Sequence, residues 1–492
     1  MISYAPPQDP LLAIASEIAS EARKLGCDEA EIRIVDRELD WLTVRNKKLE
    51  SRTFLQDEGV GVRVRFKGAP GYAASSDRSP ESIRNALQDA LAIARSVQDT
   101  TYAAPRHAEP TIEKGTYRSP TPGGDAFALP LESRIARLHD LSSTLGTSSD
   151  IVVASATQVL LRRRTRLASM HGTLIDQTIS LHGGGIQAIA QENGQLQQRS
   201  FPKAFEGNLL QGGEEVFKRL ALAQNAERVR EEAIALCHAP ACPETRTNLI
   251  LDGSQLSLHI HETCGHPTEA DRALREELSL AGSSFLSPKL LGTRYQYGSP
   301  IVNLVADATT PNGAGTFGWD DEGSRANQID LIRKGEFVGF LNNRSTSERI
   351  DCEPISACRA ESWDAEPIVR MVNINLEPGS NGSLEDLIKN TDEGILMSGN
   401  RSWSIDDHRL NFQFGCEAAY EIKAGKRGQL LRNPVYTGIT PSFWKGCDAI
   451  CDSSAWEMWG YLFCGKGDPM QIMHVGHGTA PARFTDAQVC AS

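Results

Sequence analysis

The run from His259 to Arg272 limits the folds open to this chain more than any other stretch of it. The run reads H-I-H-E-T-C-G-H-P-T-E-A-D-R and begins inside an apolar segment. At its centre, residues 261–266 form an H-E-x-x-x-H pattern, one residue longer than the H-E-x-x-H of common zinc proteases. Imidazole and thiolate are donors that zinc prefers, and Glu262 stands beside the first histidine, where a carboxylate can act as general base on a metal-bound water.

The extra residue is incompatible with a regular helix at a metal site. Side chains five positions apart on an ideal α-helix diverge by roughly 140°, so His261 and His266 would not face one ion. Gly265 loosens the backbone, and Pro267 lacks the N–H that a continuing helix needs. We therefore expect irregular helix at 264–267, either a widened turn such as a π-bulge or a helix end. Taken alone, the motif is equally consistent with a helix whose histidines are ordinary polar residues.

Length and charge narrow the class of protein. A chain of 492 residues exceeds one ordinary core, so we expect two or three domains. The net charge of −12 argues against a nucleic-acid partner, because phosphate contacts need clustered lysine and arginine. The basic run at 162–166 alternates with apolar residues, which is typical of a solvated strand face. No stretch approaches the roughly 20 apolar residues of a membrane span, so we expect no membrane partner either.

The N-terminal residues and the cysteines favour a cytoplasmic location. Residues 1–7 have neither the basic start nor the apolar core of a secretion signal. Eleven cysteines is an odd count, and they lack the close spacing of a disulfide framework. We expect reduced thiols, one or two of which serve as metal ligands.

Hydrophobic periodicity and turn residues divide the chain into α+β units. We expect an N-terminal α+β domain at 1–101, a linker or long loop rich in Pro, Gly, Thr and Ser at 102–130, a central α+β domain at 131–243 and a C-terminal domain at 244–485. Many short strands with glycine-rich turns follow the motif in the last unit. The fold class that follows is α+β, in which a large, strand-rich, barrel-like C-terminal domain carries the motif helix.

Local signals predict the elements of the first two units. Proline at the first helical position predicts helices at 10–25 and 80–97. Alternating apolar residues predict three strands of the first unit, at 30–35, 41–45 and 59–66. In the second unit we expect a helix across 135–145, several strands between 151 and 200, and a helix at 213–236.

A catalytic zinc ion usually has three protein ligands and a water, so the two motif histidines need a partner. Spacing offers several residues, each of which, taken alone, is more often structural or exposed: Cys264, His408, Cys447, Cys451, His474 and His477. Cys464 has a different context, because two glycines and Lys466 surround it and a nearby positive charge favours the thiolate. Spacing alone leaves the choice open.

Several motifs in a fixed order resemble the TldD/PmbA family of zinc metalloproteases. They are the H-E-x-x-x-H with Glu269 and Asp271, the acidic turn at 320–323, Cys464-Gly465-Lys466 and Val475-Gly476-x-Gly478-x-x-Pro481. The resemblance extends from the N-terminal sheet unit to Pro481 and is closest to the TldD-like, catalytic branch. It implies that His261, His266 and Cys464 bind one Zn²⁺ per chain and that Glu262 is the general base. His259, Pro267 and the residues after Lys466 depart from the family pattern.

The resemblance implies a metallopeptidase that hydrolyses peptide bonds of extended or unfolded polypeptides, with a metal-bound water activated by Glu262 as nucleophile. One alternative is a zinc amidohydrolase that acts on a small modified peptide. A second alternative is a non-catalytic binding or regulatory subunit, although a structural metal would not need Glu262. The resemblance further implies a dimer, formed either by two copies or with a PmbA-like chain.

Overall fold

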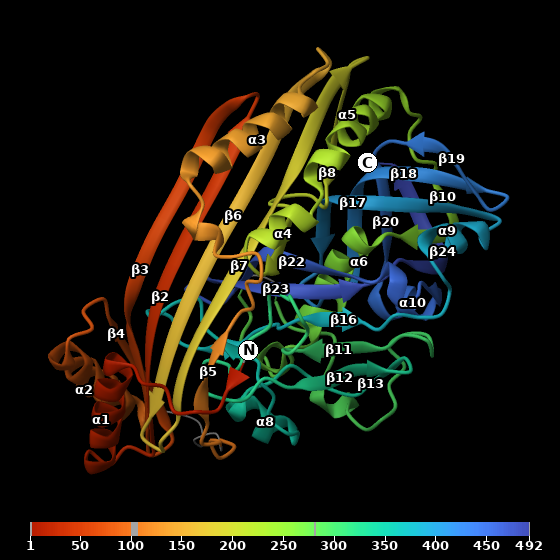
Figure 1. Ribbon diagram of the computed structural model, residues 1–492. Helices are drawn as coiled ribbons and strands as arrows, with labels where there is room; N and C mark the ends of the chain where they lie inside the picture. Colours follow the sequence, from red (N-terminus) through yellow and green to blue (C-terminus); the bar gives the residue numbers. More distant parts are fainter. Residues whose placement is uncertain (1, 100–106, 280–281, 492) are drawn as a thin grey trace.

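The computed structural model describes residues 2–99, 107–279 and 282–491. Residues 100–106, which include the start of the expected linker, therefore lie outside the described part. Within the described part, no helix combines the length and the apolar character needed to cross a membrane. The fold is α+β, as predicted, and it has a long N-terminal sheet beside a C-terminal barrel (Figure 1).

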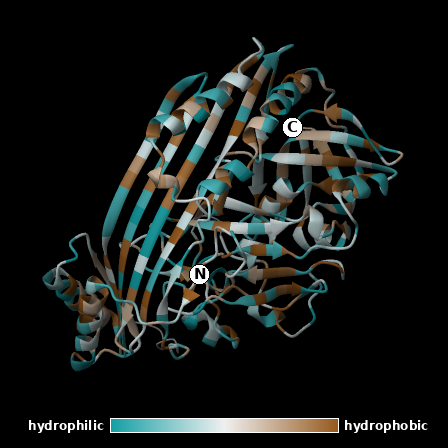
Figure 2. Ribbon diagram, in the orientation of Figure 1, coloured by the Kyte–Doolittle hydropathy of each residue, from teal (hydrophilic) through white to brown (hydrophobic). Residues whose placement is uncertain are grey.

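One nine-stranded sheet forms the N-terminal half, in the order β1-β5-β7-β6-β2-β3-β4, with β8 and β9 also paired to β7. The strands are β1 (Ile2–Ser3), β2 (Glu29–Arg45), β3 (Lys48–Phe66), β4 (Ala69–Ser75), β5 (Lys114–Arg118), β6 (Ile151–Ser169), β7 (Leu174–Glu192), β8 (Gln195–Phe201) and β9 (Asn208–Gln211). Polar and apolar residues alternate in bands along the long strands (Figure 2). The two N-terminal units expected from sequence share this sheet, because β2 pairs with β6 along most of its length.

Helices cover the two ends of this sheet. α1 (Pro10–Lys24) and α2 (Pro80–Val97) lie at one end, and α3 (Leu131–Leu145) and α5 (Leu222–His238) lie toward the other (Figure 1). The predictions for α1 and α2 are confirmed: Asp9 and Ser79 cap their first turns through side-chain oxygens. The helix expected at 213–236 is divided into α4 (Glu214–Arg219) and α5, because Ala221 adopts the left-handed backbone conformation.

Two other local predictions are wrong. The separate strands expected at 30–35 and 41–45 are parts of the single strand β2, whose ladder to β3 and β6 continues through the polar residues between them. The expected loop at 102–130 contains β5, which pairs in parallel with β7. In both cases, pairing with strands distant in the sequence determines the backbone conformation, and local sequence patterns do not predict that pairing.

Five strands close the C-terminal barrel, because β10 pairs with both β17 and β24, and β18 and β20 complete the circuit. The barrel strands are β10 (Thr245–Leu251), β17 (Glu393–Ile405), β18 (Asn411–Lys423), β20 (Pro434–Ile439) and β24 (Ala482–Ala491), with β19 (Lys426–Leu431) and β21 (Cys447–Ile450) added at the side. Helix α6 (Gly253–Ile260) packs against the barrel, and all eight of its residues are buried. The predicted barrel-like domain that carries the motif helix is confirmed.

Smaller elements surround the barrel. One sheet contains β11 (Leu304–Asp307), β12 (Gln328–Arg333), β13 (Glu336–Phe337) and β16 (Ile374–Leu376). Two hairpin-like pairs join β14 (Cys358–Arg359) to β15 (Ile368–Val369) and β22 (Glu457–Lys466) to β23 (Gln471–Thr479). The short helices are α7 (Ala270–Ala273), α8 (Arg344–Ile350), α9 (Leu384–Lys389) and α10 (Thr440–Lys445).

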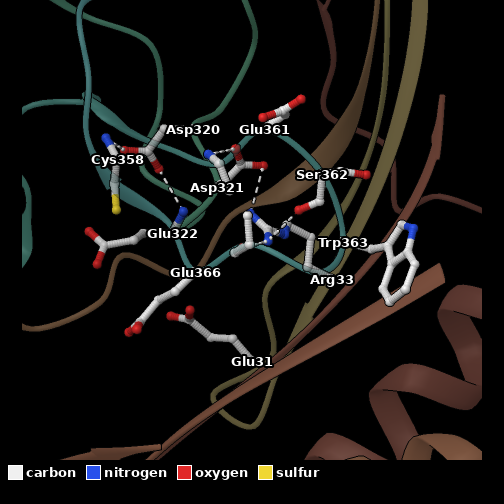
Figure 3. A network of polar contacts seen from close by, with 12 residues as sticks. Glu31, Arg33, Asp320, Asp321, Glu322, Cys358, Glu361, Ser362, Trp363 and Glu366 are labelled. Atoms are coloured by element: carbon white, nitrogen blue, oxygen red, sulfur yellow. Dashed lines mark hydrogen bonds and ion pairs between the residues drawn. The ribbon is translucent and has the colours of Figure 1, made fainter. Parts of the chain in front are cut away.

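Ion pairs between largely buried side chains connect the sheet to the barrel domain; Figure 3 shows Arg33, Asp321 and Glu322. The Asp321 carboxylate forms an ion pair with the Arg163 guanidinium of β6, with nitrogen and oxygen 2.9 Å apart. The same carboxylate lies 3.6 Å from the Arg33 guanidinium of β2. Glu322, the next residue, pairs with Arg63 of β3 at 3.0 Å. We call these five residues the arginine–carboxylate joint. Because the acidic turn meets arginines from three strands, the joint fixes the sheet against the domain that carries the motif.

Candidate metal centre

The H-E-x-x-x-H motif lies where α6 stops being regular. Residues His261–Gly265 form a π-helical turn, and His266–Thr268 form a 3₁₀ turn that contains Pro267. A π turn accommodates one residue more than an α turn, so the two histidines come to one side, with ring centroids 4.8 Å apart. The predicted irregular helix is confirmed.

Gly265 lies against Met371, so a side chain at this position would force Met371 to move. A Cβ atom at this position would lie 2.3 Å from Sδ of Met371. The glycine therefore lets the widened turn pack directly against the chain segment that precedes β16.

Cys464 of β22 completes the group. The donor atoms of His261, His266 and Cys464 all lie within 4.8 Å of one another, and the Cys464 sulfur is 4.0 Å from Nε2 of His266. Zinc bonds of about 2.0–2.1 Å to nitrogen and 2.3 Å to sulfur place tetrahedral donors roughly 3.3–3.6 Å apart. Small side-chain rotations would bring the three donors to that spacing. The residues present therefore fit a zinc ion, and within 2–99, 107–279 and 282–491 no other group of His, Cys, Asp and Glu converges in this way.

Hydrogen bonds orient both histidines with Nε2 toward the centre. His266 uses Nδ1 for a 3.1 Å contact to the Glu269 carboxylate. His261 uses Nδ1 for a 2.8 Å contact to Nε2 of His477, whose own Nδ1 lies 3.2 Å from the carbonyl of Ile374. If His477 donates to that carbonyl, it accepts from His261, and the lone pair on Nε2 of His261 is free for a metal. Such outer partners fix ligand tautomers in metal sites.

Cys464 lies in surroundings that favour its thiolate. Burial by itself raises the pKa of this thiol, but Arg370 and His266 outweigh burial and hold the pKa below its ordinary value. The guanidinium of Arg370 also donates to the Cys464 carbonyl. Cys264, inside the motif, shows the opposite behaviour, because burial without a nearby cation raises its pKa. Charge therefore separates the two cysteines, and Arg370 gave no signal in the sequence.

Glu262 is buried in the π turn and ion-paired with Arg409, a residue of the turn between β17 and β18. Burial raises the pKa of Glu262, but Arg409, His266, His261 and a hydrogen bond from Trp403 together lower it below the ordinary value. Glu262 is therefore a carboxylate at neutral pH. Sequence reasoning missed Arg409, which follows Asp406-Asp407-His408 in an otherwise ordinary polar turn.

The structure places the remaining ligand candidates elsewhere. His474 bonds to the Leu462 carbonyl, and His408 bonds to Ser283. His477 orients His261, as described above, and does not join the group of converging donors. Cys447 begins β21 and Cys451 directly follows that strand; neither belongs to that group.

Two parts of the chain match the same family. Residues 244–489 match the family described as "PmbA/TldA metallopeptidase C-terminal domain", and residues 30–94 match "PmbA/TldA metallopeptidase domain 1". A protein of Methanothermobacter thermautotrophicus named "Metalloprotease" is 26% identical over 460 residues, which cover 94% of this chain and 95% of that protein. A "Zinc metalloprotease TldD homolog" of Saccharolobus solfataricus is 25% identical over 230 residues, which cover 46% of this chain and 48% of the relative.

A solved structure from Thermotoga maritima, described as a modulator of a DNA gyrase, has the same fold. Its TM-score is 0.75 at 16% identity, over 97% of this chain and 99% of that chain. Two histidines and a carboxylate on an irregular helix packed against a barrel, together with a thiolate from a distant strand, are the site of a metallopeptidase-type enzyme. The chain belongs to the PmbA/TldD metallopeptidase family.

Proposed function

We propose that this chain is a zinc-dependent peptidase that hydrolyses extended or unfolded polypeptides, with Glu262 as general base. The observation that carries the proposal is the convergence of His261, His266 and Cys464 beside a buried carboxylate. A structural zinc site normally has four protein ligands and needs no base, whereas three ligands leave one position open. A thiolate among the ligands favours zinc over harder divalent ions.

The chain's own residues have distinct tasks in this proposal. When bound, zinc supplies a Lewis acid that polarises a peptide carbonyl and lowers the pKa of water. Glu262 takes the proton from the attacking water and passes it to the leaving amine. Arg409 keeps Glu262 ionised and fixes its position. Glu269 and His477 hold the two histidines in the tautomers that present Nε2.

Burial of the centre supports an extended substrate. His261 and His266 are 4% exposed, Glu262 5% and Cys464 2%. A folded protein could not bring a peptide bond to side chains so enclosed, whereas a single extended strand could. The same enclosure would admit a small modified peptide, so the length of the cleaved substrate separates the peptidase from an amidohydrolase. A dimer, with a second copy or a PmbA-like chain, is part of the proposal.

Metal content tests the ligand set. Zinc is measured by elemental analysis of dialysed wild type, His266→Ala, Cys464→Ala and the control Cys264→Ala, which removes a buried thiol of the same motif. We expect about one zinc per chain in wild type and in the control, and loss of zinc in the other two. Zinc retained in Cys464→Ala would assign the third ligand to another residue.

Cleavage tests the base. Glu262→Gln should keep its zinc and lose peptide hydrolysis by roughly 10²–10⁴-fold, which is the usual contribution of a general base. The readout is cleavage of a denatured protein and of a short peptide by wild type and variant. Equal rates for the two enzymes would refute the role of Glu262. Wild type that carries zinc and cleaves neither substrate would favour the non-catalytic alternative.

A further inference from the structure

Two buried lysines lie near the metal centre, and only Lys466 has a carboxylate at ion-pair distance. Lys466 is fully buried and donates to Asp271 at 2.7 Å and to the Val369 carbonyl at 2.6 Å. Lys203 is 4% exposed, and its ammonium lies over the ring of Tyr461, 4.0 Å from the centroid. Among the described residues, no carboxylate forms an ion pair or a hydrogen bond with Lys203. Glu206 of the same loop acts on Lys203 only through its charge, so the ammonium over the ring can still pair with an anion.

Lys203 comes from the N-terminal sheet but faces the catalytic side of the barrel domain. It belongs to the 202–207 loop between β8 and β9. Directly after this loop, Asn208 fastens the chain to β22, because its side chain donates to the Met458 carbonyl at 3.0 Å and accepts from Gly460 N–H at 2.7 Å. The loop therefore has a fixed position beside the strand that carries Cys464.

Tyr461 connects Lys203 to the centre. Its ring lies 5.8 Å from that of His261, and its hydroxyl bonds to Ser257 of α6 at 2.7 Å. The charge of Lys203 also reaches His477 and contributes to lowering the pKa of that imidazole. The ammonium thus stands one aromatic ring away from a proposed zinc ligand.

The same loop contributes an exposed aromatic residue, Phe205, that contacts Trp403. Phe205 contacts Trp403 edge to face with centroids 5.7 Å apart, and the two side chains are 50% and 44% exposed. Trp403 in turn helps to lower the pKa of Glu262. Phe205 has φ of 63°, an unfavourable conformation for a bulky residue, and such conformations cluster at ligand sites. The loop therefore places an apolar patch and a cation on the rim of the same centre.

We propose that Lys203 binds a carboxylate of the peptide substrate, while Phe205 and Trp403 contact a neighbouring apolar side chain. This inference rests on the proposed peptidase function. The carboxylate is either the C-terminal group of the substrate or the side chain of an aspartate or glutamate. Burial lowers the pKa of Lys203 to about 8, with Glu206 opposing the shift, so the side chain remains mostly charged at neutral pH.

The test measures binding, separately from cleavage. A short neutral peptide, labelled with a fluorophore at its N-terminus, is titrated with zinc-loaded Glu262→Gln protein. The peptide is prepared with a free C-terminal carboxylate, with a C-terminal amide, and with the amide plus one internal glutamate. The protein carries native Lys203, Lys203→Met, Lys203→Arg or the control Lys218→Met, which alters an exposed lysine of α4. Thermal unfolding checks that Lys203→Met is folded.

We expect Lys203→Met to weaken binding of a carboxylate-bearing peptide by roughly 10-fold or more, with no effect on the neutral amide. Lys203→Arg should recover part of the loss, and Lys218→Met should match the parent. The arm that responds, free C-terminus or internal glutamate, identifies the source of the carboxylate. Equal binding of acidic and neutral peptides to native Lys203, or an equal loss for both in Lys203→Met, would overturn the proposal. The titrated samples are also checked for cleaved peptide, so an error in the role of Glu262 would appear as cleavage by the Glu262→Gln protein, whereas failure of the Lys203 proposal would appear in the binding constants of intact peptide.

Discussion

The arginine–carboxylate joint and the metal centre are both buried and polar, yet their groups are arranged in opposite ways. At the joint, the carboxylates of Asp321 and Glu322 meet guanidinium groups at ion-pair distance. At the metal centre, His261, His266 and Cys464 turn donor atoms of one kind toward each other. The joint satisfies its own charges, whereas the centre is arranged for a cation that the chain itself does not supply.

The difference shows how a structural cluster is told from a functional one. A buried charge costs much free energy unless it is paired, so complementary pairing indicates a role in holding domains together. Lone pairs that converge on one point do not stabilise the fold by themselves; a bound metal ion supplies the stabilisation. Mutations in the joint should therefore lower the free energy of unfolding, whereas mutations in the centre should weaken metal binding.

The largest effect on stability is expected at the joint. Asp321→Ala leaves Arg33 and Arg163 buried without their carboxylate, so we expect a loss of about 3–5 kcal/mol in the free energy of unfolding. Urea unfolding of metal-free protein measures it. The control is Asp448→Ala, which breaks the surface pair with Arg483 and should cost about 0–1 kcal/mol. Equal losses in the two variants would remove the distinction between the joint and an ordinary surface pair.

A smaller effect, on zinc affinity, is expected at His477, which contacts the proposed ligand His261. His477→Phe removes the acceptor for Nδ1 of His261, so we expect zinc affinity to fall by roughly 10–100-fold while saturation still gives one zinc per chain. Competition with a chelator of known affinity measures this. His474→Phe is the matched control, because that ring bonds to a backbone carbonyl and belongs to no ligand contact. Unchanged affinity in His477→Phe would mean that His261 does not depend on this contact for its orientation.

Acid should weaken the joint. Burial raises the pKa of Asp321, but Arg163 and Arg33 outweigh burial, so the folded pKa lies below the value of about 3.9 in an unfolded chain. A lowered folded pKa means that the contribution of Asp321 is fully present above the unfolded pKa and is lost as pH falls through the folded pKa. The difference in unfolding free energy between wild type and Asp321→Ala should therefore be constant near neutral pH and shrink below about pH 4. A difference that grows on acidification would contradict this pairing.

Sequence predicted those features that depend on neighbours in the chain. Proline at the first helical position predicted α1 and α2, and the spacing of the motif with Gly265 and Pro267 predicted the irregular turn. Sequence patterns did not predict long-range strand pairing. β2 pairs with β6, although local patterns assigned the residues of these two strands to different units. The resemblance supplied Cys464, whose distance from His266 along the chain gives no local signal. Arg409, His477 and Lys203 reach the centre only through closure of the barrel and docking of the sheet.

The smallest effect is expected at His259, although it lies only two positions before His261. Its ring is fully buried among aromatic side chains, its Nε2 has no hydrogen-bond partner, and burial lowers its pKa to about 3. The histidine therefore acts as a neutral core residue, and its Nδ1 makes only a 3.3 Å contact to the Tyr436 hydroxyl. Gln255 also bonds to that hydroxyl and has an unused carbonyl oxygen that could replace the lost acceptor.

His259→Leu should accordingly change the free energy of unfolding by less than about 1.5 kcal/mol, because it exchanges side chains of similar volume and removes an unpaired polar atom. Zinc content should remain one per chain, whereas the same substitution at His261 should abolish it. Urea unfolding and elemental analysis of the two variants provide the comparison. A loss at His259 as large as that of Asp321→Ala, or a loss of zinc, would show that this histidine supports the centre through its position in α6.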